Sequence, residues 1–407
     1  MFSVSDLEFK LVMSFLNLCR EPFRLFFPLG ILMGVWGLSP WLLYALKVIE
    51  TPIPFFHSSM MILTYMNSFI IGFLLTAMPR FSGTARASAA EVFYFFILTL
   101  TTAVFLHLKQ WLGAECLYIL WLAGLLRFSL VRIKQSKRNE SSGQTQPAMI
   151  WIPIAVLHGF IGTSLLVLGQ TRIFPSWAIL MGKPMMEQGF VLSIVLGIGG
   201  FLIPRLMGTR EIFSRSITFH LLAAFLLFLS FVGEGMKQDV LGYGLRALVV
   251  TAEFIGGNIL PGPPRSKDFY IKLIWISAWM TSLGLWLAAI FPLHHAAMLH
   301  VVFIGGFSLM TLSVGTMVSM THSGAMEILR RPLWIFWMMG GAFLLALFKR
   351  VGVSFFPEAY FSFLGIAAFF WILGAVLWLC FISVYLVRFP EADEFEKIHE
   401  EAKKPLA

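Results

Sequence analysis

The chain has 407 residues, of which 58% are hydrophobic and 13% are charged, whereas a soluble domain carries about a quarter charged residues. This composition excludes a soluble globular protein and predicts an integral membrane protein. The formal net charge of +9 does not indicate nucleic-acid binding, because the basic residues lie in short loops between apolar segments. In such loops they set membrane orientation and contact lipid headgroups. The expected partner is therefore the lipid bilayer, with no nucleic acid.

Three cysteines, Cys19, Cys116 and Cys380, lie far apart and form no CxxC or CxxCH motif. They predict neither a disulfide scaffold nor a zinc site, and any haem would be bound non-covalently as haem b. The N-terminal segment, residues 1–22, has scattered charges and no clean apolar run before a small-residue cleavage site. We expect this segment to be retained on the cytoplasmic side and not to act as a signal peptide.

A transmembrane helix needs about 20 mostly apolar residues. Windows of this kind predict an all-α, polytopic membrane protein with twelve spans in a single transmembrane domain, residues 1–407. The seventh and eighth windows are the weakest, because they are short or are interrupted by Arg246 and Glu253. The predicted spans are residues 23–46, 57–79, 90–109, 111–131, 149–169, 185–207, 216–233, 240–259, 271–291, 294–319, 332–348 and 359–387.

Arginine and lysine concentrate in the loops on one side of these spans, most clearly in the basic loop 132–148. Cytoplasmic loops of membrane proteins are enriched in these residues. The bias predicts that both termini, including the acidic tail 389–407, lie in the cytoplasm.

Spans two, six and ten run from outside to inside and end alike, in GFLLTAMPRFSG, GGFLIPRLMG and TMVSMTHSG. Repeat folds in membranes leave only weak internal similarity of this kind. The endings favour a period of four spans and hence three four-helix units. The alternative is that every inner helix end needs a helix breaker and a cation, so that similar endings arise independently.

Two histidines, His57 and His300, lie near the outer ends of spans two and ten, at depths within roughly 10 Å of each other. Ionisable residues inside a membrane are functional candidates, because burying them without a partner is costly. Two imidazoles at similar depth predict a shared ligand, and we expect haem iron with two axial histidines. For each histidine alone, the alternative is an interfacial side chain bonded to a loop carbonyl.

Several basic residues are further candidates. Lys349 and Arg350, at the outer end of span eleven, either extend to the interface or hold the propionates of a haem. Arg246 is a third cofactor-binding candidate. It lies two turns from Glu253 on span eight, and the two side chains either pair through neighbours or form a structural charge pair.

The remaining histidines divide into candidates and ordinary residues. His158, near the middle of span five, is a candidate for a second metal or a proton path. His322, in the THSG turn at the inner end of span ten, is a candidate metal ligand or a helix cap. His294 and His295 are expected at the interface, where a surface copper site is the alternative. His107 and His220 are expected to be ordinary residues near span ends.

Three segments are similar to those of a known family: FRLFFPLG at 23–30, FHSSMMILTYMNSFIIGFLLTAMPRFSG at 56–83 and HVVFIGGFSLMTLSVGTMVSMTHSG at 300–324. IGGFLIP at 198–204 matches a fourth, shorter motif. Through them the chain resembles the NnrS family, bacterial twelve-span membrane proteins that contain haem and copper and are linked to nitric-oxide stress. The family's second histidine and following glutamate fall on Ser59 and Met60 here. Its motif arginines fall on Phe201, Met317 and Ala325.

The predicted arrangement is also similar to the catalytic subunit of haem–copper oxidases, in which twelve spans form three arcs. There a low-spin haem lies between histidines near the outer ends of spans two and ten, and a basic pair holds its propionates. His57, His300 and the Lys349-Arg350 pair fall at those places. The copper histidines of spans six and seven are missing, so an oxidase-type binuclear centre is not expected.

The resemblance implies an NnrS-type haem protein of the bacterial cytoplasmic (inner) membrane, acting in nitric-oxide tolerance or metabolism. Its chemistry would be redox chemistry or electron transfer at a bis-histidine haem b, with copper as a second metal and a quinol or cytochrome as electron donor. Whether the protein is an enzyme, an oxidoreductase acting on nitric oxide, stays open. The alternatives are a twelve-span secondary transporter with a site formed by Arg246, Glu253 and His158, and an assembly factor that only carries haem.

Overall fold

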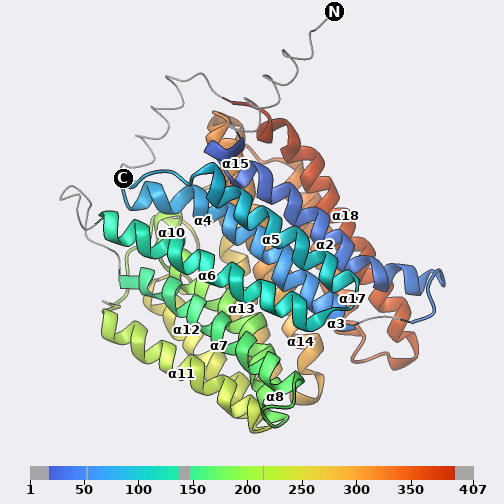
Figure 1. Cartoon of the computed structure of the whole chain (residues 1–407). Coiled ribbons are helices and arrows are strands. Elements are labelled where there is room, and N and C mark those ends of the chain that lie inside the picture. The colour runs from blue at the N-terminus through green and yellow to red at the C-terminus, as the bar shows by residue number, and fades with distance from the viewer. Residues whose placement is uncertain (1–17, 52–53, 137–146, 214, 390–407) are drawn as a thin grey trace, which may run out of the picture.

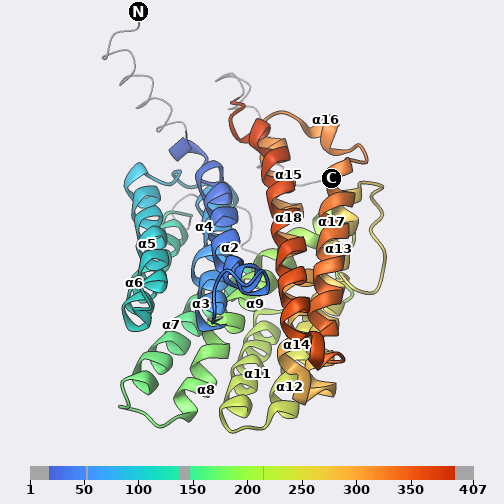
Figure 2. The ribbon, with the colours of Figure 1, turned by 90° about the vertical axis from the view of Figure 1, so that its right-hand side faces the viewer.

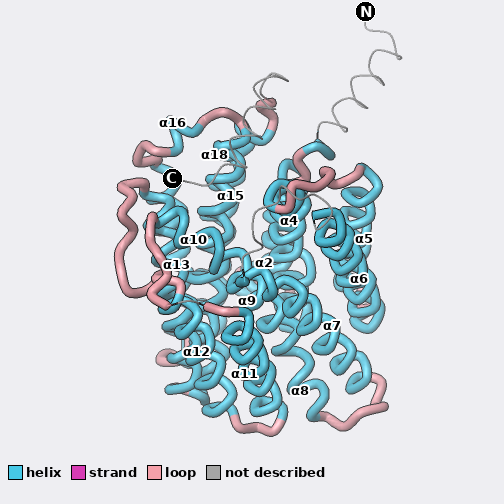
Figure 3. Tube along the Cα trace, turned by 90° about the vertical axis from the view of Figure 1, so that its left-hand side faces the viewer, coloured by secondary structure: helices cyan, strands magenta, loops and turns pink. Residues whose placement is uncertain are grey.

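The computed structural model describes residues 18–51, 54–136, 147–213 and 215–389. Within these ranges all regular structure is helical, and eleven helices are long and apolar enough to cross a membrane. They lie side by side in one bundle, and the loops gather at its two ends (Figures 1 and 3). The prediction of an all-α, multi-pass membrane protein is confirmed. The tail from residue 390, most of the N-terminal segment and the middle of the basic loop lie outside the described residues.

The first five spans match the predicted windows closely. They are α2 (Phe23–Ala45), α3 to α4 (Pro54–Phe81), α5 (Ala89–His107), α6 (Trp111–Ser136) and η2 with α7 (Pro147–Gln170).

The later spans follow in the predicted order, with a short helix α16 (Met326–Leu329) in a loop. They are α8 to α10 (Trp177–Met207), α11 (Ile217–Gly235), α12 (Asp239–Gly256), α13 (Phe269–Ile290), η5 to α15 (Pro292–His322), α17 (Trp334–Gly352) and η7 with α18 (Pro357–Leu386). The sixth span begins eight residues before its predicted start at 185, because the helix continues through Pro184.

Helix α12 corresponds to the predicted eighth span, but it is not one of the eleven helices that are apolar enough to cross a membrane. It carries Asp239, Arg246 and Glu253, and it packs between α11 and α13. Both Arg246 and Glu253 are almost completely buried. An interrupted hydrophobic window is therefore compatible with a bundle helix here, because the charged side chains face protein partners and not lipid.

Spans two, six and ten form the interior of the bundle. The buried share of their apolar windows is 94%, 67% and 83%, against at most 56% for any other span described. In the part of the chain that the structure describes, these three spans also contain all the wide, π-type turns: η1 (Met60–Met66), η3 (Met185–Gly189), η4 (Val195–Gly199) and η6 (Val301–Ser308). The shared burial and shared local geometry agree with a four-span repeat. Wide turns of this kind occur frequently at functional sites.

Helices α7 and α8 (Trp177–Pro184) cross at a pair of glycines, Gly162 and Gly182. A Cβ atom placed on Gly162 would lie 2.5 Å from the backbone nitrogen of Met186 and 2.8 Å from the carbonyl oxygen of Gly182. Backbone atoms cannot move aside as a flexible side chain does. Small residues at such crossings let membrane helices approach closely.

We expect Gly162→Ala to lower the stability of the folded protein by about 1–3 kcal/mol, the usual effect of overpacking. The measurement is the apparent melting temperature in detergent. Gly244→Ala in α12 is the matched control, because nothing lies within 4 Å of its added Cβ and alanine favours the helix. Equal melting temperatures for Gly162→Ala and the wild type would contradict the predicted clash.

Candidate functional site

The structure brings His57 and His300 together from spans two and ten. His57 lies in α3 (Pro54–Ser59) and His300 ends α14 (His295–His300). Their ring centroids are 6.5 Å apart, and the ring planes are within 11° of parallel. Helices α3 and α14 lie in the half of the bundle opposite α16 (Figure 2). Because the rings are this close, the two imidazoles lie at a common depth in that half of the bundle.

One nitrogen of each imidazole is fixed by a backbone carbonyl. The His57 Nδ1 lies 3.2 Å from the carbonyl oxygen of Gly37 in α2, and the His300 Nδ1 lies 2.6 Å from that of Ala296, one turn earlier. Because a carbonyl only accepts hydrogen bonds, Nδ1 is the protonated nitrogen in both rings. The lone pair of each Nε2 is therefore available to a metal, the usual arrangement of ligating histidines.

The separation of the rings fits two ligands on opposite sides of one metal ion. An imidazole nitrogen binds a transition metal at about 2.0–2.1 Å, which places the centres of two opposed rings roughly 6–6.5 Å apart. The observed 6.5 Å agrees with this value. The pair thus has the donor atoms and the spacing that a bis-histidine iron porphyrin needs.

Aromatic and basic side chains surround the pair. The Trp41 ring contacts His57 edge-on at 6.1 Å, and the Phe303 ring contacts His300 at 5.8 Å between centroids. Arg350 acts electrostatically on both imidazoles. It also donates to the same Ala296 carbonyl that accepts from His300, at 3.4 Å.

The two residues of the basic pair are placed differently. Whereas Arg350 lies at the histidine pair, the Lys349 ammonium lies 4.4 Å from the centre of the Phe363 ring on α18. Lys183, at the start of span six, is a second cation close enough to act on His57. Lys183 was not predicted as a site residue. The only feature of the sequence that could have indicated it is the position of a lysine just before an apolar window.

Arg246 belongs to a separate buried cluster that joins spans six, seven and eight. Its guanidinium donates to Glu234 Oε2 at 2.7 Å, to Gln188 Oε1 at 2.5 Å and to Ser230 Oγ at 3.3 Å. The Tyr243 hydroxyl donates to the other oxygen of Glu234 at 2.8 Å. The direct carboxylate partner of Arg246 is therefore Glu234, and its predicted association with Glu253 through neighbours stays a prediction.

Glu253 has its own partners nearer the opposite end of the bundle. Its Oε1 accepts from His220 Nδ1 at 2.7 Å and from Trp151 Nε1 at 3.1 Å, and Arg215 lies 3.5 Å from its Oε2. His220 is 1% exposed. The sequence-based interpretation of His220 as an ordinary span-end residue missed this contact. The sequence did contain a signal for such a contact, because a carboxylate in an apolar span requires a polar partner.

His322 belongs to an ion cluster at the end of the bundle opposite the histidine pair. Its Nδ1–H donates to Glu21, its Nε2 accepts from Arg80, and Glu21 also bonds Arg24 and Arg80. Burial raises the pKa of Glu21, but its bond to His322 and its pairing with Arg24 and Arg80 outweigh burial and hold the pKa at about 2. Both ring nitrogens of His322 are thus engaged in a structural cluster that joins spans one, two and ten.

The other histidines lie apart from the pair. His158 Nδ1 lies 2.9 Å from Ser193 Oγ, and the His295 Nδ1–H donates to the Pro292 carbonyl at 2.7 Å. His294 is exposed. Among the described residues, no group of three or more histidine, cysteine, aspartate or glutamate side chains is placed to hold a metal ion. The predicted copper site and the predicted metal-binding roles of His158 and His322 remain predictions. The contacts of these residues do not support them.

A twelve-helix membrane bundle with paired imidazoles near one end defines an α-helical, multi-pass protein with a candidate cofactor site. Residues 17–389 match the family model described as NnrS protein. This match covers nearly the whole chain, so the chain belongs to the NnrS family. A comparison with curated proteins gives no match.

Proposed function

We propose that this NnrS-family protein binds one haem b between His57 and His300 and acts in nitric-oxide tolerance in the bacterial inner membrane, with both termini in the cytoplasm. The observation that carries the proposal is the pair of parallel imidazoles 6.5 Å apart. In each ring Nδ1 is held by a carbonyl, so the lone pair that could bind a metal is on Nε2.

The side chains around the pair have defined roles in this proposal. The hydrogen bonds to Gly37 and Ala296 fix the ring planes and increase the electron-donating strength of the imidazoles. Arg350 is the residue that binds a haem propionate, because guanidinium groups pair well with carboxylates. Lys183 provides a second positive charge near His57.

The bound group would supply one-electron transfer, since two axial histidines leave no open coordination position for a substrate. The electron donor would be a quinol or a cytochrome. Consumption of nitric oxide by the reduced protein would distinguish an oxidoreductase from a haem carrier.

The test is the optical and paramagnetic spectrum of the protein purified in detergent. We expect sharp low-spin b-type bands on reduction, a pyridine haemochrome that corresponds to one haem per chain, and a low-spin bis-imidazole signal when oxidised. A protein that stays colourless after incubation with haemin would contradict the proposal. So would a high-spin spectrum in both oxidation states.

A further inference from the structure

An apolar cavity of about 100 Å³ lies between spans two, six and ten. Phe73 on span two, Ile198 on span six and Val314 on span ten line it, together with Phe27 from span one. Among the described residues that line the cavity, Thr311 alone has a polar side chain. The three most buried helices of the bundle therefore do not close completely on one another.

The partial exposure of the lining residues is further evidence for a space between these helices. Val195, Ile198 and Leu202 follow one stripe of span six and are half-buried, although most of that span is buried. Thr311 and Val314 show the same pattern on span ten, whose window is 83% buried. All five residues line this space, which is partly open to the surroundings of the bundle.

The chemistry of the lining selects its occupant. A buried water needs two to four polar partners, and apolar cavities of about 150 Å³ stay dry and bind benzene or xenon. One threonine hydroxyl does not satisfy a water cluster, and about 100 Å³ does not hold a lipid chain or a porphyrin. We propose that this cavity binds a small, uncharged, apolar molecule, namely a dissolved gas.

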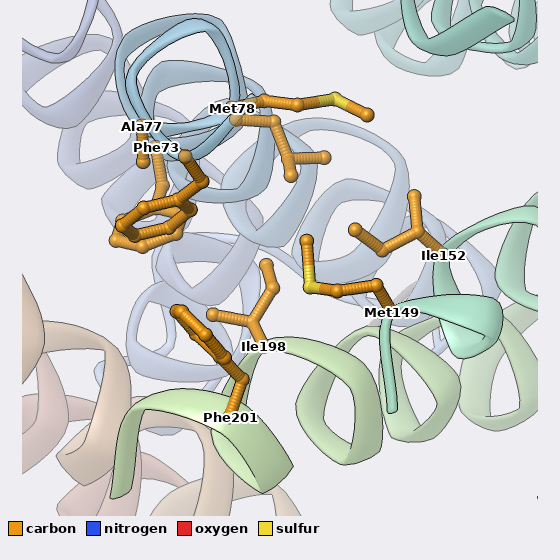
Figure 4. A pocket seen from close by; sticks show the side chains of 9 residues that line it. Phe73, Ala77, Met78, Met149, Ile152, Ile198 and Phe201 are labelled. Carbon is orange, nitrogen blue, oxygen red and sulfur yellow. The ribbon is translucent and has the colours of Figure 1, made fainter. Parts of the chain in front are cut away.

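A second pocket, of only about 10 Å³, adjoins the first. It shares Phe73 and Ile198 with the first cavity, and Phe201 also lines it (Figure 4). Phe81, at the inner end of span two, is 42% exposed. The second cavity is lined only by apolar side chains of the described residues, Met149 and Ile152 of span five among them.

The cavity lies beneath the histidine pair on the same two helices. Met66, which lines it, follows His57 by nine residues, or about 14 Å of helix. Identifying the gas as nitric oxide rests on the proposed function. The binding of an apolar gas does not, because it depends only on the size and lining of the cavity.

Xenon is the probe that tests the site. We expect crystals of the full-length protein pressurised with xenon to show an anomalous peak among Phe73, Ile198 and Val314. Val314→Phe should remove the peak, because the larger ring fills the space, and Ile198→Ala should increase its occupancy. Val104→Phe on the exposed face of α5 is the matched control and should leave the peak unchanged.

Ordered water or a co-purified acyl chain in the cavity, with no xenon peak, would overturn the proposal. A peak that persists in Val314→Phe would also overturn it. If Val314→Phe does not fold, the xenon occupancy in Ile198→Ala tests the proposal instead. A larger cavity must bind more xenon, so an unchanged occupancy would contradict the site. Xenon binding by a protein that takes up no haem would support this site while contradicting the proposed function.

Discussion

Replacing His300 with alanine is expected to give a protein that folds in the membrane but no longer retains haem. His300 would supply one of the two axial nitrogens, and His57→Ala would remove the other. Loss even of a residue that only orients a metal ligand costs 10–100-fold in affinity, so we expect haem content to fall by at least about tenfold. Haem per chain, from the pyridine haemochrome of protein purified in parallel, is the measurement.

His294→Ala is the matched control for this experiment. His294 lies six residues before His300, is exposed, and contacts the Phe355 ring at 6.5 Å between centroids. We expect its spectrum and haem content to equal those of the wild type. Elution as a single species on size exclusion would show that the His57 and His300 variants are folded. Wild-type bands in either variant would show that the histidine pair does not hold the haem.

Arg24→Met is expected to produce the largest loss of stability among single substitutions in the ion cluster of Glu21, Arg24, Arg80 and His322. The Arg24 side chain is 3% exposed, and it donates to Glu21 at 2.8 Å. It also donates to the carbonyl oxygens of Tyr385, Leu386 and Arg388 at 2.8–3.0 Å, at the end of α18. Methionine fills a similar volume but leaves the Glu21 carboxylate and these carbonyls without this donor. Breaking a buried ion pair in this way costs about 3–5 kcal/mol.

The control for Arg24→Met is Arg20→Met, the same change four residues earlier at an exposed position. Its apparent melting temperature should match the wild type, whereas that of Arg24→Met should fall clearly. The difference should also depend on pH. Since the folded-state pKa of Glu21 is about 2 and its ordinary value is 4.5, the contribution of the ion pair is complete above pH 4.5. It is lost as the pH falls towards 2. Equal melting of Arg24→Met and Arg20→Met would contradict the buried cluster.

Composition and the periodic placement of apolar windows predicted the fold class. In a bilayer the backbone must satisfy its own hydrogen bonds, so long apolar windows form helices whatever their neighbours are. The depth of a residue within a helix also follows from its position in the chain. For this reason the common depth of His57 and His300 could be predicted before their contact was known.

The pairing of the buried charged residues could not be predicted from the sequence. Glu253 in an apolar span required a partner, but its partners His220 and Trp151 lie on other helices, 33 and 102 residues away in the chain. Arg246 pairs with Glu234 across a helix hairpin and not with Glu253, two turns away on its own helix. Span windows give the depth of a side chain but not the direction in which it points.

The amino-acid sequence by itself determined an α-helical, multi-pass membrane protein of the NnrS family and the shared depth of two histidines. Only the tertiary structure decided that the two rings are parallel, that Arg350 lies beside them while Lys349 contacts Phe363, and that spans two, six and ten leave an apolar cavity. The physical reason is that hydrophobicity fixes how each helix crosses the bilayer. Rotation and approach of the helices are instead fixed by side-chain packing between segments distant in the chain.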